Sequence, residues 1–161
     1  MKKILAIILV GIFVVSIPAV SSVMIPKLSI KQTFETPIQS ADVPEWADGN
    51  ITGVYAIKNE TGEFEIIGNI FGHFHLWSNN SGYYRGIWEA QDGSENGEFA
   101  GWFLYHISIG YYNVTGSEDT DGFISLFRRN ESDMTIQAVA IGSQGDDYFI
   151  RYSLCSYTIF E

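Results

Sequence analysis

The chain has 161 residues, of which 9 are basic and 19 acidic, for a net charge of −10. A surface of that sign repels phosphate backbones, so we expect no nucleic acid partner. A single cysteine, Cys155, excludes an intramolecular disulfide, and a hydrophobic core must therefore hold the domain together.

The N-terminus has the layout of an export signal. Lys2 and Lys3 precede an apolar run from Ile4 to Val15, and small residues follow. An uncleaved anchor is the alternative, because the stretch from Ile4 to Ile25 reaches the roughly 20 residues of a membrane-spanning helix. Residues 1–22 are therefore predicted to be a signal peptide or a transmembrane anchor. Both predict a protein that is extracellular or held at the cell surface.

The rest of the chain divides into a tether and one domain. Residues 23–44 contain three prolines and no sustained period, which predicts a tether. Residues 45–161 are predicted to form a single β-domain, and about 115 residues are enough for one hydrophobic core.

A glycine motif returns four times in the first half of this domain. Each copy places a glycine, a large apolar residue, a second glycine and an aromatic residue at alternate positions. Alternation of this kind is typical of β-strands, and its repetition indicates a β-meander. The copies are Gly49–Tyr55, Gly68–Phe74, Gly82–Trp88 and Gly97–Phe103.

The periodicity predicts about seven strands. The clearest keeps a period of two for seven positions from Phe64 to Leu76, and the fourth carries an inner face that continues through Ile107 and Ile109. The fold class is therefore all-β, an antiparallel meander that forms a small barrel or a two-layer sandwich. The predicted strands are Asn50–Lys58, Glu63–Trp77, Gly82–Ala90, Gly97–Tyr112, Gly122–Arg129, Met134–Gly142 and Asp147–Phe160.

The tight turn after the second predicted strand sets its register with the third. We expect Phe74 opposite Gly86 and Gly72 opposite Trp88, so that each glycine makes room for a ring of the neighbouring strand. Because many rings share this inner face, we expect a filled interior rather than an open ligand cavity.

The outer face of these strands is more aromatic than a solvated face would be. It carries Trp77, Tyr83 and Trp102, together with His75 and Arg85, which the expected register places opposite each other. Such residues dominate binding hot spots, and flat aromatic strips also suit sugar rings. Two interpretations stay open: a patch that binds an envelope protein or a glycan, and a face buried beneath a second layer.

The histidines offer a candidate metal site. His73 and His75 lie two residues apart, and His106 stands on the equivalent face of the fourth predicted strand, as in a three-histidine zinc site. The intervening strand separates them by roughly 10 Å, so we expect neither a metal nor another cofactor. The acidic segment 118–121 similarly lacks the ligands of a calcium loop. Cys155 is expected to be a small buried hydrophobe.

Five sequons mark candidate glycosylation sites. Each can accept an N-glycan where the export machinery supplies one, and chance occurrence in turns is the alternative. They begin at Asn50, Asn59, Asn79, Asn113 and Asn130.

The sequence Tyr84-Arg-Gly86-Ile-Trp88 resembles the opening of MORN-type repeats, although the copies lie 19, 14 and 15 residues apart rather than at that family's regular period. The block Trp46–Tyr55, with the later copies, is similar to uncharacterised exported archaeal proteins that carry a glycine-aromatic β-domain. This resemblance covers Pro44–Glu161. It implies export and a β-fold, with no assigned activity.

The sequence contains no serine-centred elbow, phosphate loop or metalloprotease helix motif. It therefore favours a non-enzymatic envelope domain, exported or membrane-anchored, that is structural or binds a partner or glycan. A barrel that binds a small ligand is the alternative. A metal-dependent enzyme that uses His73 and His75 is less favoured.

Overall fold

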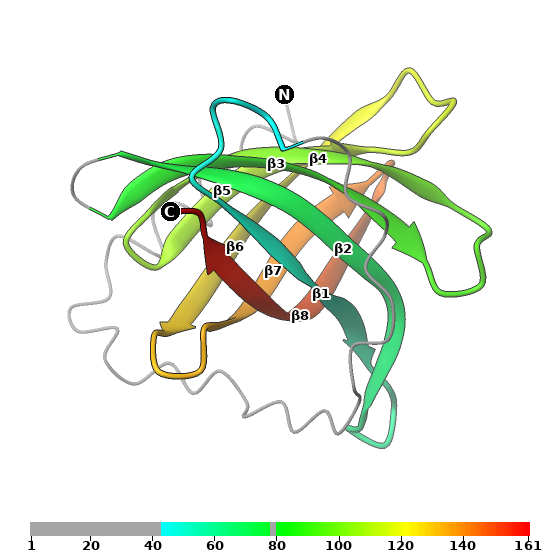
Figure 1. Cartoon of the computed structure of the whole chain (residues 1–161). Helices are drawn as coiled ribbons and strands as arrows, with labels where there is room; N and C mark the ends of the chain where they lie inside the picture. Colours follow the sequence, from blue (N-terminus) through cyan, green and yellow to red (C-terminus); the bar gives the residue numbers. More distant parts are fainter. Residues whose placement is uncertain (1–42, 78–79) are drawn as a thin grey trace, which may run out of the picture.

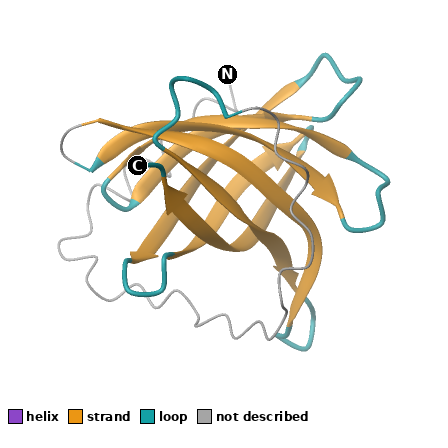
Figure 2. Ribbon diagram, in the orientation of Figure 1, coloured by secondary structure: helices purple, strands orange, loops and turns teal. Residues whose placement is uncertain are grey.

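The computed structural model describes residues 43–77 and 80–161, which form a β-sheet structure (Figure 1). Strands and loops account for this part of the chain, and none of it is a helix that could cross a membrane (Figure 2). The predicted segment 1–22 and most of the tether lie outside the described residues. The strands are β1 (Gly49–Lys58), β2 (Phe64–Trp77), β3 (Ser81–Ala90), β4 (Asn96–Leu104), β5 (Ile107–Asn113), β6 (Thr120–Asn130), β7 (Thr135–Gln144) and β8 (Asp147–Ile159).

The sheet is a closed barrel. Each strand pairs antiparallel with the next, and β8 returns to pair with β1. The closing ladder runs from Gly49 opposite Ile159 to Ala56 opposite Tyr152. The all-β prediction is thereby confirmed, and of its two expected forms the structure adopts the barrel. Closure leaves none of the described strands with a free edge, which protects a small β-domain from edge-to-edge association.

The predicted single strand Gly97–Tyr112 is wrong, because the structure divides it into β4 and β5. Tyr105 and His106 form the turn between them, and Tyr105 adopts a left-handed φ of 55°. An aromatic residue seldom takes this conformation, so the sequence carries no signal for the turn. A backbone hydrogen bond holds it in place, since Tyr105 N donates to Asn80 O at 2.9 Å.

This turn also changes which side chains of β5 face inward. Leu104 pairs with Ile107, and the inner face therefore passes from Phe103 to Ser108. Ile109, which was expected to continue the inner face, is 58% exposed on the outside. A small residue consequently replaces an expected large one inside the barrel.

The register of β2 and β3 lies two residues from the expected one. Phe74 pairs with Tyr84, and Gly72 pairs with Gly86. The hairpin supplies the reason, because Asn80 adopts a left-handed φ of 55°, which asparagine tolerates, and the turn closes earlier than expected. A shift of two residues keeps every side chain on its face but gives it a new partner.

Glycines make room for rings on the neighbouring strand, as expected, although through different pairs. An added Cβ would lie 2.6 Å from Cζ of Phe103 at Gly82, and 2.6 Å from Cζ of Phe123 at Gly110. No side chain fits at such distances, so glycine is required where a ring crosses the adjacent strand. The pairs of this kind are Gly49 and Phe74, Gly68 and Tyr55, Gly82 and Phe103, Gly86 and Phe99, Gly97 and Trp88, Gly101 and Tyr84, Gly110 and Phe123, and Gly142 and Phe149.

Replacing Gly86 with valine should overpack the barrel wall, because an added Cβ would lie 2.5 Å from Cζ of Phe99 and 2.7 Å from Cα of Gly72. We expect Gly86→Val to lower the free energy of unfolding by about 1–3 kcal/mol in chemical denaturation. Gly122→Val is the matched control, since the nearest atom to its added Cβ, Gly110 O, lies 3.9 Å away. Equal losses for the two variants would contradict the packing described above.

Candidate functional site

The barrel encloses a cavity of about 770 Å³. The expectation of a filled interior is therefore wrong. The reason lies in the second half of the barrel, where small residues alternate with rings at the inward positions and leave space between them. These small lining residues are Ser108 on β5, Ser125 on β6, Ala138 and Ala140 on β7, and Ser153 on β8.

The first half of the barrel supplies a wall of rings. Tyr84, Trp88, Phe99 and Phe103 line the cavity from β3 and β4. The polar edge of Trp88 is already satisfied, because its Nε1 donates a hydrogen bond to the Asn113 carbonyl at 3.0 Å. This wall therefore presents mainly apolar ring faces to the interior.

Tyr84 supplies the hydroxyl of this wall. Its oxygen lies 2.5 Å from Oγ of Ser108 on β5. Burial raises the pKa of Tyr84 to about 12, and the hydrogen bond to Ser108 opposes that rise. Tyr84 is therefore neutral at physiological pH and cannot act as a base on the Ser108 hydroxyl.

Arg151 brings a positive charge into this lining from β8. Its Cζ lies 5.1 Å from the ring centroid of Phe149, in cation–π geometry. Its Nη1 lies 3.5 Å from the Ile150 carbonyl, and no described carboxylate lies within 4.0 Å of the guanidinium. The site residues predicted from the sequence do not include Arg151. Period-two alternation from Cys155, which was predicted to be buried, would have located this residue.

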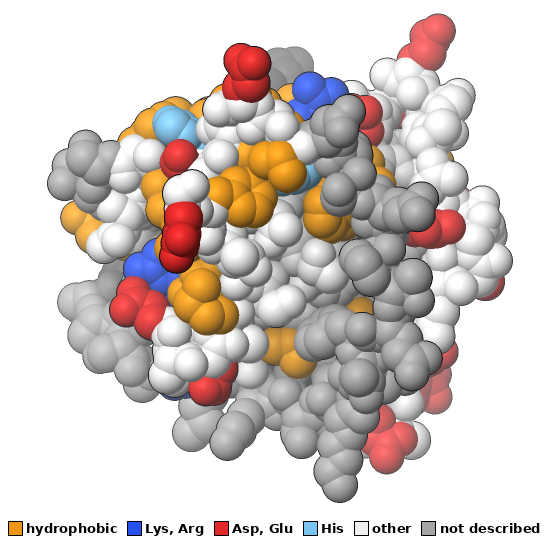
Figure 3. Space-filling view, in the orientation of Figure 1, with side chains coloured by type: hydrophobic (Ala, Val, Ile, Leu, Met, Phe, Trp, Pro, Cys, Tyr) orange, Lys and Arg blue, Asp and Glu red, His pale blue; other side chains and the backbone are white. Residues whose placement is uncertain are grey.

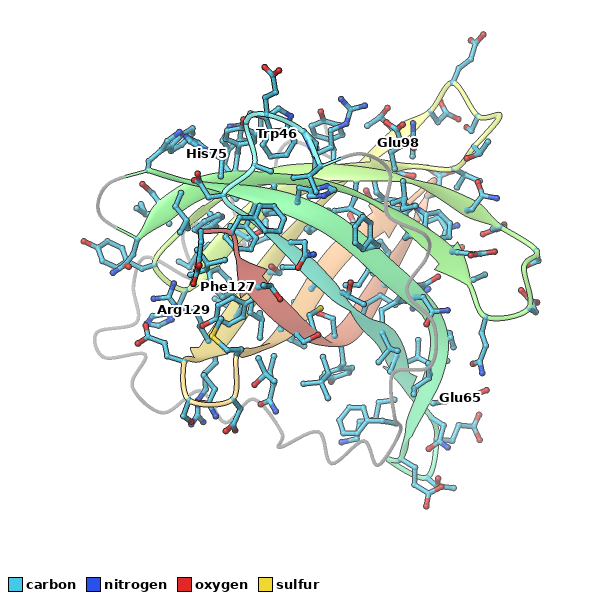
Figure 4. The ribbon with its side chains drawn as sticks, in the orientation of Figure 1. Trp46, Glu65, His75, Glu98, Phe127 and Arg129 are labelled. Atoms are coloured by element: carbon cyan, nitrogen blue, oxygen red, sulfur yellow. The ribbon has the colours of Figure 1, made fainter. Side chains whose placement is uncertain are left out.

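Charged side chains also occupy the two ends of the cavity. Exposed Glu65, Asp92 and Glu95 line it at the end that contains the β3–β4 loop. Arg129 lines the opposite end and pairs with Glu131 at 2.7 Å. Figure 4 labels Glu65 near the start of β2, and Phe127 and Arg129 near the end of β6. The cavity thus has an acidic rim at one end and the Arg129–Glu131 ion pair at the other.

Cys155 faces the interior opposite Gly53 and is only 4% exposed. Burial raises the pKa of its thiol to about 12. The expectation of a buried small hydrophobe is confirmed. A thiol in this position stays protonated and is a poor nucleophile.

Cys155 should therefore resist labelling in the folded protein. At about pH 8 we expect a disulfide reagent to modify it at least about a hundredfold more slowly than in denaturant, because attack requires the thiolate and access. The absorbance of the thiolate that the reagent releases measures the labelling rate of Cys155 in the folded protein and in denaturant. Rapid stoichiometric labelling without denaturant would contradict the burial of Cys155.

The histidines take separate environments rather than one site. His73 is 6% exposed on the outer face of β2, with the rings of Phe71 and Trp46 at 5.2 and 6.3 Å, and burial lowers its pKa. Nδ1 of His75 lies 2.9 Å from Oδ2 of Asp48, outside hydrogen-bonding geometry.

His106 lies in the β4–β5 turn, with its ring 6.3 Å from that of Phe127. Strand β3 separates it from the histidines of β2. Within residues 43–77 and 80–161, no group of three or more His, Cys, Asp or Glu side chains could hold a metal ion. Asp121, from the acidic segment, instead accepts a hydrogen bond from Gly145 N at 3.3 Å.

The expected outer aromatic patch is partly assembled. Trp77 and Trp102 are 47% and 56% exposed, and Tyr83 pairs with Trp102 across the strands. Tyr83 also lies opposite His75, where Arg85 was expected.

Two neighbours limit this patch. The ring of Trp46 lies 4.9 Å from that of Tyr83 and covers part of it, and Figure 4 places Trp46 on the same side of the sheet as His75. Arg85 binds Glu98 through an exposed ion pair of 3.1 Å.

The outer surface continues this patch as a row of apolar residues that the sequence did not indicate. The row crosses five adjacent strands by direct pairing. Figure 3 shows further hydrophobic side chains that reach the surface on the side of the barrel that it draws. Most members of the row are about half exposed. Its members are Trp102, Ile109, Ile124, Ile141 and Ile150.

The sequons occupy strands and strand ends. Oδ1 of Asn113 accepts a hydrogen bond from Glu98 N at 2.8 Å, and Nδ2 of Asn130 donates to Asp133 at 2.7 Å. Glycosylation at these sites stays a prediction. Asn50 lies in β1, Asn59 follows β1, Asn113 and Asn130 end β5 and β6, and Asn79 lies outside the described residues.

Comparison with protein families, curated proteins and solved structures found no match to this chain. The geometry of the barrel is therefore the basis for assigning a function.

Proposed function

We propose that this protein is a non-enzymatic binding protein that holds a small apolar molecule inside its barrel. The cavity of about 770 Å³ carries the proposal. Small-molecule sites span roughly 300–1,000 Å³ and are lined mainly by apolar side chains with few polar groups. The proposal places this activity outside the cell or at its surface, on the strength of the basic and apolar N-terminal segment.

The walls of the cavity suit an elongated apolar ligand. The lining combines rings from β3 and β4 with small side chains from β5 to β8. A bound ligand would shield the ring faces from water and fill the space that the small side chains leave. Burial of apolar surface contributes roughly 25 cal/mol per Å². The β3–β4 loop, through Gln91 and Asp92, borders the cavity and offers a route for exchange.

Replacing Ala138 with phenylalanine tests the cavity directly. Ala138 lines the interior of β7, so the new ring should occupy the ligand space. We expect the affinity for N-phenylnaphthylamine, a neutral apolar fluorophore, to fall by at least about tenfold in a fluorescence titration. Circular dichroism should be unchanged, because a ring placed in an existing cavity requires little rearrangement.

Val139→Phe is the control, since Val139 is the next residue of β7 and points to the outer face. It should leave the affinity for the fluorophore unchanged. The proposal fails if the parent protein does not bind the fluorophore and native mass spectrometry of protein from its own host shows no bound small molecule. It also fails if folded Ala138→Phe binds as the parent does.

A second candidate function is supported by the exposure of Trp77 and Trp102. Aromatic rings on a flat outer surface suit sugar rings or a protein partner. The notable observation is that the apolar row runs on from Trp102 over four further strands. Monomeric soluble proteins rarely expose contiguous apolar patches of large area.

The double substitution of Trp77 and Trp102 by alanine tests this patch. We expect it to weaken binding of envelope polysaccharide from the host by at least about tenfold, measured by calorimetry, without a change in the thermal midpoint. The control is the double substitution Glu118→Ala and Asp119→Ala in the exposed β5–β6 loop. Undiminished binding by the tryptophan variant would remove the patch as the site.

A further inference from the structure

Arg151 is the basic residue of the cavity lining that has no carboxylate partner within residues 43–77 and 80–161. Arg129, which also lines the cavity, pairs with Glu131, and Arg85 on the outer surface pairs with Glu98. Among the described residues, Arg151 contacts the ring of Phe149 and makes one long hydrogen bond to a carbonyl. A guanidinium has five N–H donors, so most of the donors of Arg151 are unused.

A tyrosine hydroxyl at the same end of the cavity also has free hydrogen-bonding capacity. Tyr55 lines the cavity from β1, and its hydroxyl has no hydrogen-bond partner among the described side chains. Burial raises the pKa of Tyr55 to about 12, the charge of Arg151 opposes that rise, and the charges of Glu95 and Asp92 add to it. Tyr55 pairs with Ser153 across the β1–β8 ladder, two residues along β8 from Arg151, so both side chains lie at the same end of the interior. Tyr55 is therefore a neutral donor at physiological pH.

Tyr112 differs, although the charge of Arg151 acts on it as well. Its hydroxyl already donates to the Ser143 carbonyl at 2.8 Å, so it can only accept a further hydrogen bond. Among the described residues that line this end of the cavity, Arg151 and Tyr55 thus keep free donors, as do the amides of Gln91 and Gln144. Free donors of a cationic guanidinium and a neutral hydroxyl match an anionic acceptor.

The acidic rim does not neutralise Arg151. Glu65, Asp92 and Glu95 are exposed, and each lies beyond ion-pair distance from the guanidinium. Charges in water are screened over about 8 Å at physiological ionic strength, whereas an anion bonded to Arg151 is in direct contact. A charge inside an apolar cavity is costly unless it is paired.

We propose that the ligand is an amphipathic carboxylate of the fatty-acid type, with its head group on Arg151 and Tyr55 and its chain along the apolar interior. This inference rests on the proposed function of the cavity. From Arg151 the chain would run past Ala138 and Ile136 toward Phe127, which lines the opposite end of the cavity. One carboxylate can accept a bidentate pair of hydrogen bonds from the guanidinium and a further one from the tyrosine.

The test compares two probes of equal chain length, dodecanoate and dodecanol, by calorimetry on the folded parent and on Arg151→Gln. We expect the parent to bind dodecanoate at least about tenfold more tightly than dodecanol, because a charge-assisted bidentate contact is made only by the acid. Arg151→Gln should abolish this preference and change the affinity for dodecanol by less than about twofold.

Arg129→Gln is the matched control, because Arg129 also lines the cavity but has its own carboxylate partner. It should keep the preference for dodecanoate. Equal affinities of the parent for both probes would overturn the inference and leave the proposed function intact. The parent is also titrated with a third probe, dodecylamine, and a preference for it would likewise overturn the inference and assign the head group to the acidic rim. Binding of none of the three probes, nor of the neutral fluorophore, would instead refute the proposed function.

Should Arg151→Gln fail to fold, the ratio of the two affinities in the parent decides the matter. Tyr55→Phe then supplies the second variant, since it removes only the hydroxyl and keeps the ring beside Trp88. We expect it to lower the affinity for dodecanoate by about three- to tenfold and to leave the affinity for dodecanol unchanged. Equal weakening of both probes would overturn the assignment of Tyr55 to the head group.

Discussion

The barrel depends on the close approach of aromatic rings to glycines on neighbouring strands. A ring that lies over Gly82 or Gly110 occupies the space that a side chain at that glycine would take. Such sites also permit the bending that closure of a small sheet requires. Because each ring of these pairs lies over the glycine directly opposite it on the next strand, the pairs select the register of adjacent strands. The same contact therefore fixes curvature, register and the thickness of the wall.

The distribution of these pairs explains where the interior is filled and where it is hollow. Rings line the interior from both halves of the barrel, but β5 to β8 also turn small residues such as Ser125 and Ala140 inward. At a glycine, the ring of the neighbouring strand fills the space that a side chain would take. At a serine or alanine with no such ring over it, the space stays empty. Arg151 stands at the border between the two halves, where its charge is held among rings and its donors face open volume.

The sequence predicted the parts of this structure that follow from alternation. The strand through Phe74, the meander and the role of glycine were predicted correctly. The β4–β5 turn was not, because Tyr105 takes a left-handed conformation for which the sequence carries no marker, and Asn80 shifted one register by two residues. The cavity was missed because rings near the start of the domain were taken as typical of all strands. Arg151 could have been found from its place in the alternation, although its lack of a partner depends on folding.

Closure of β1 on β8 has a consequence for how the interior exchanges its contents. Passage between two strands would break a ladder that runs from Gly49 to Ala56 on one side, so molecules must pass through an end of the barrel. The residues that border that route, such as Gln91 and Asp92, belong to a loop and contribute no inward ring to the wall. The residues that decide which molecules enter the barrel and the residues that stabilise the fold therefore lie in different segments of the chain. Either can change through mutation while the other is kept.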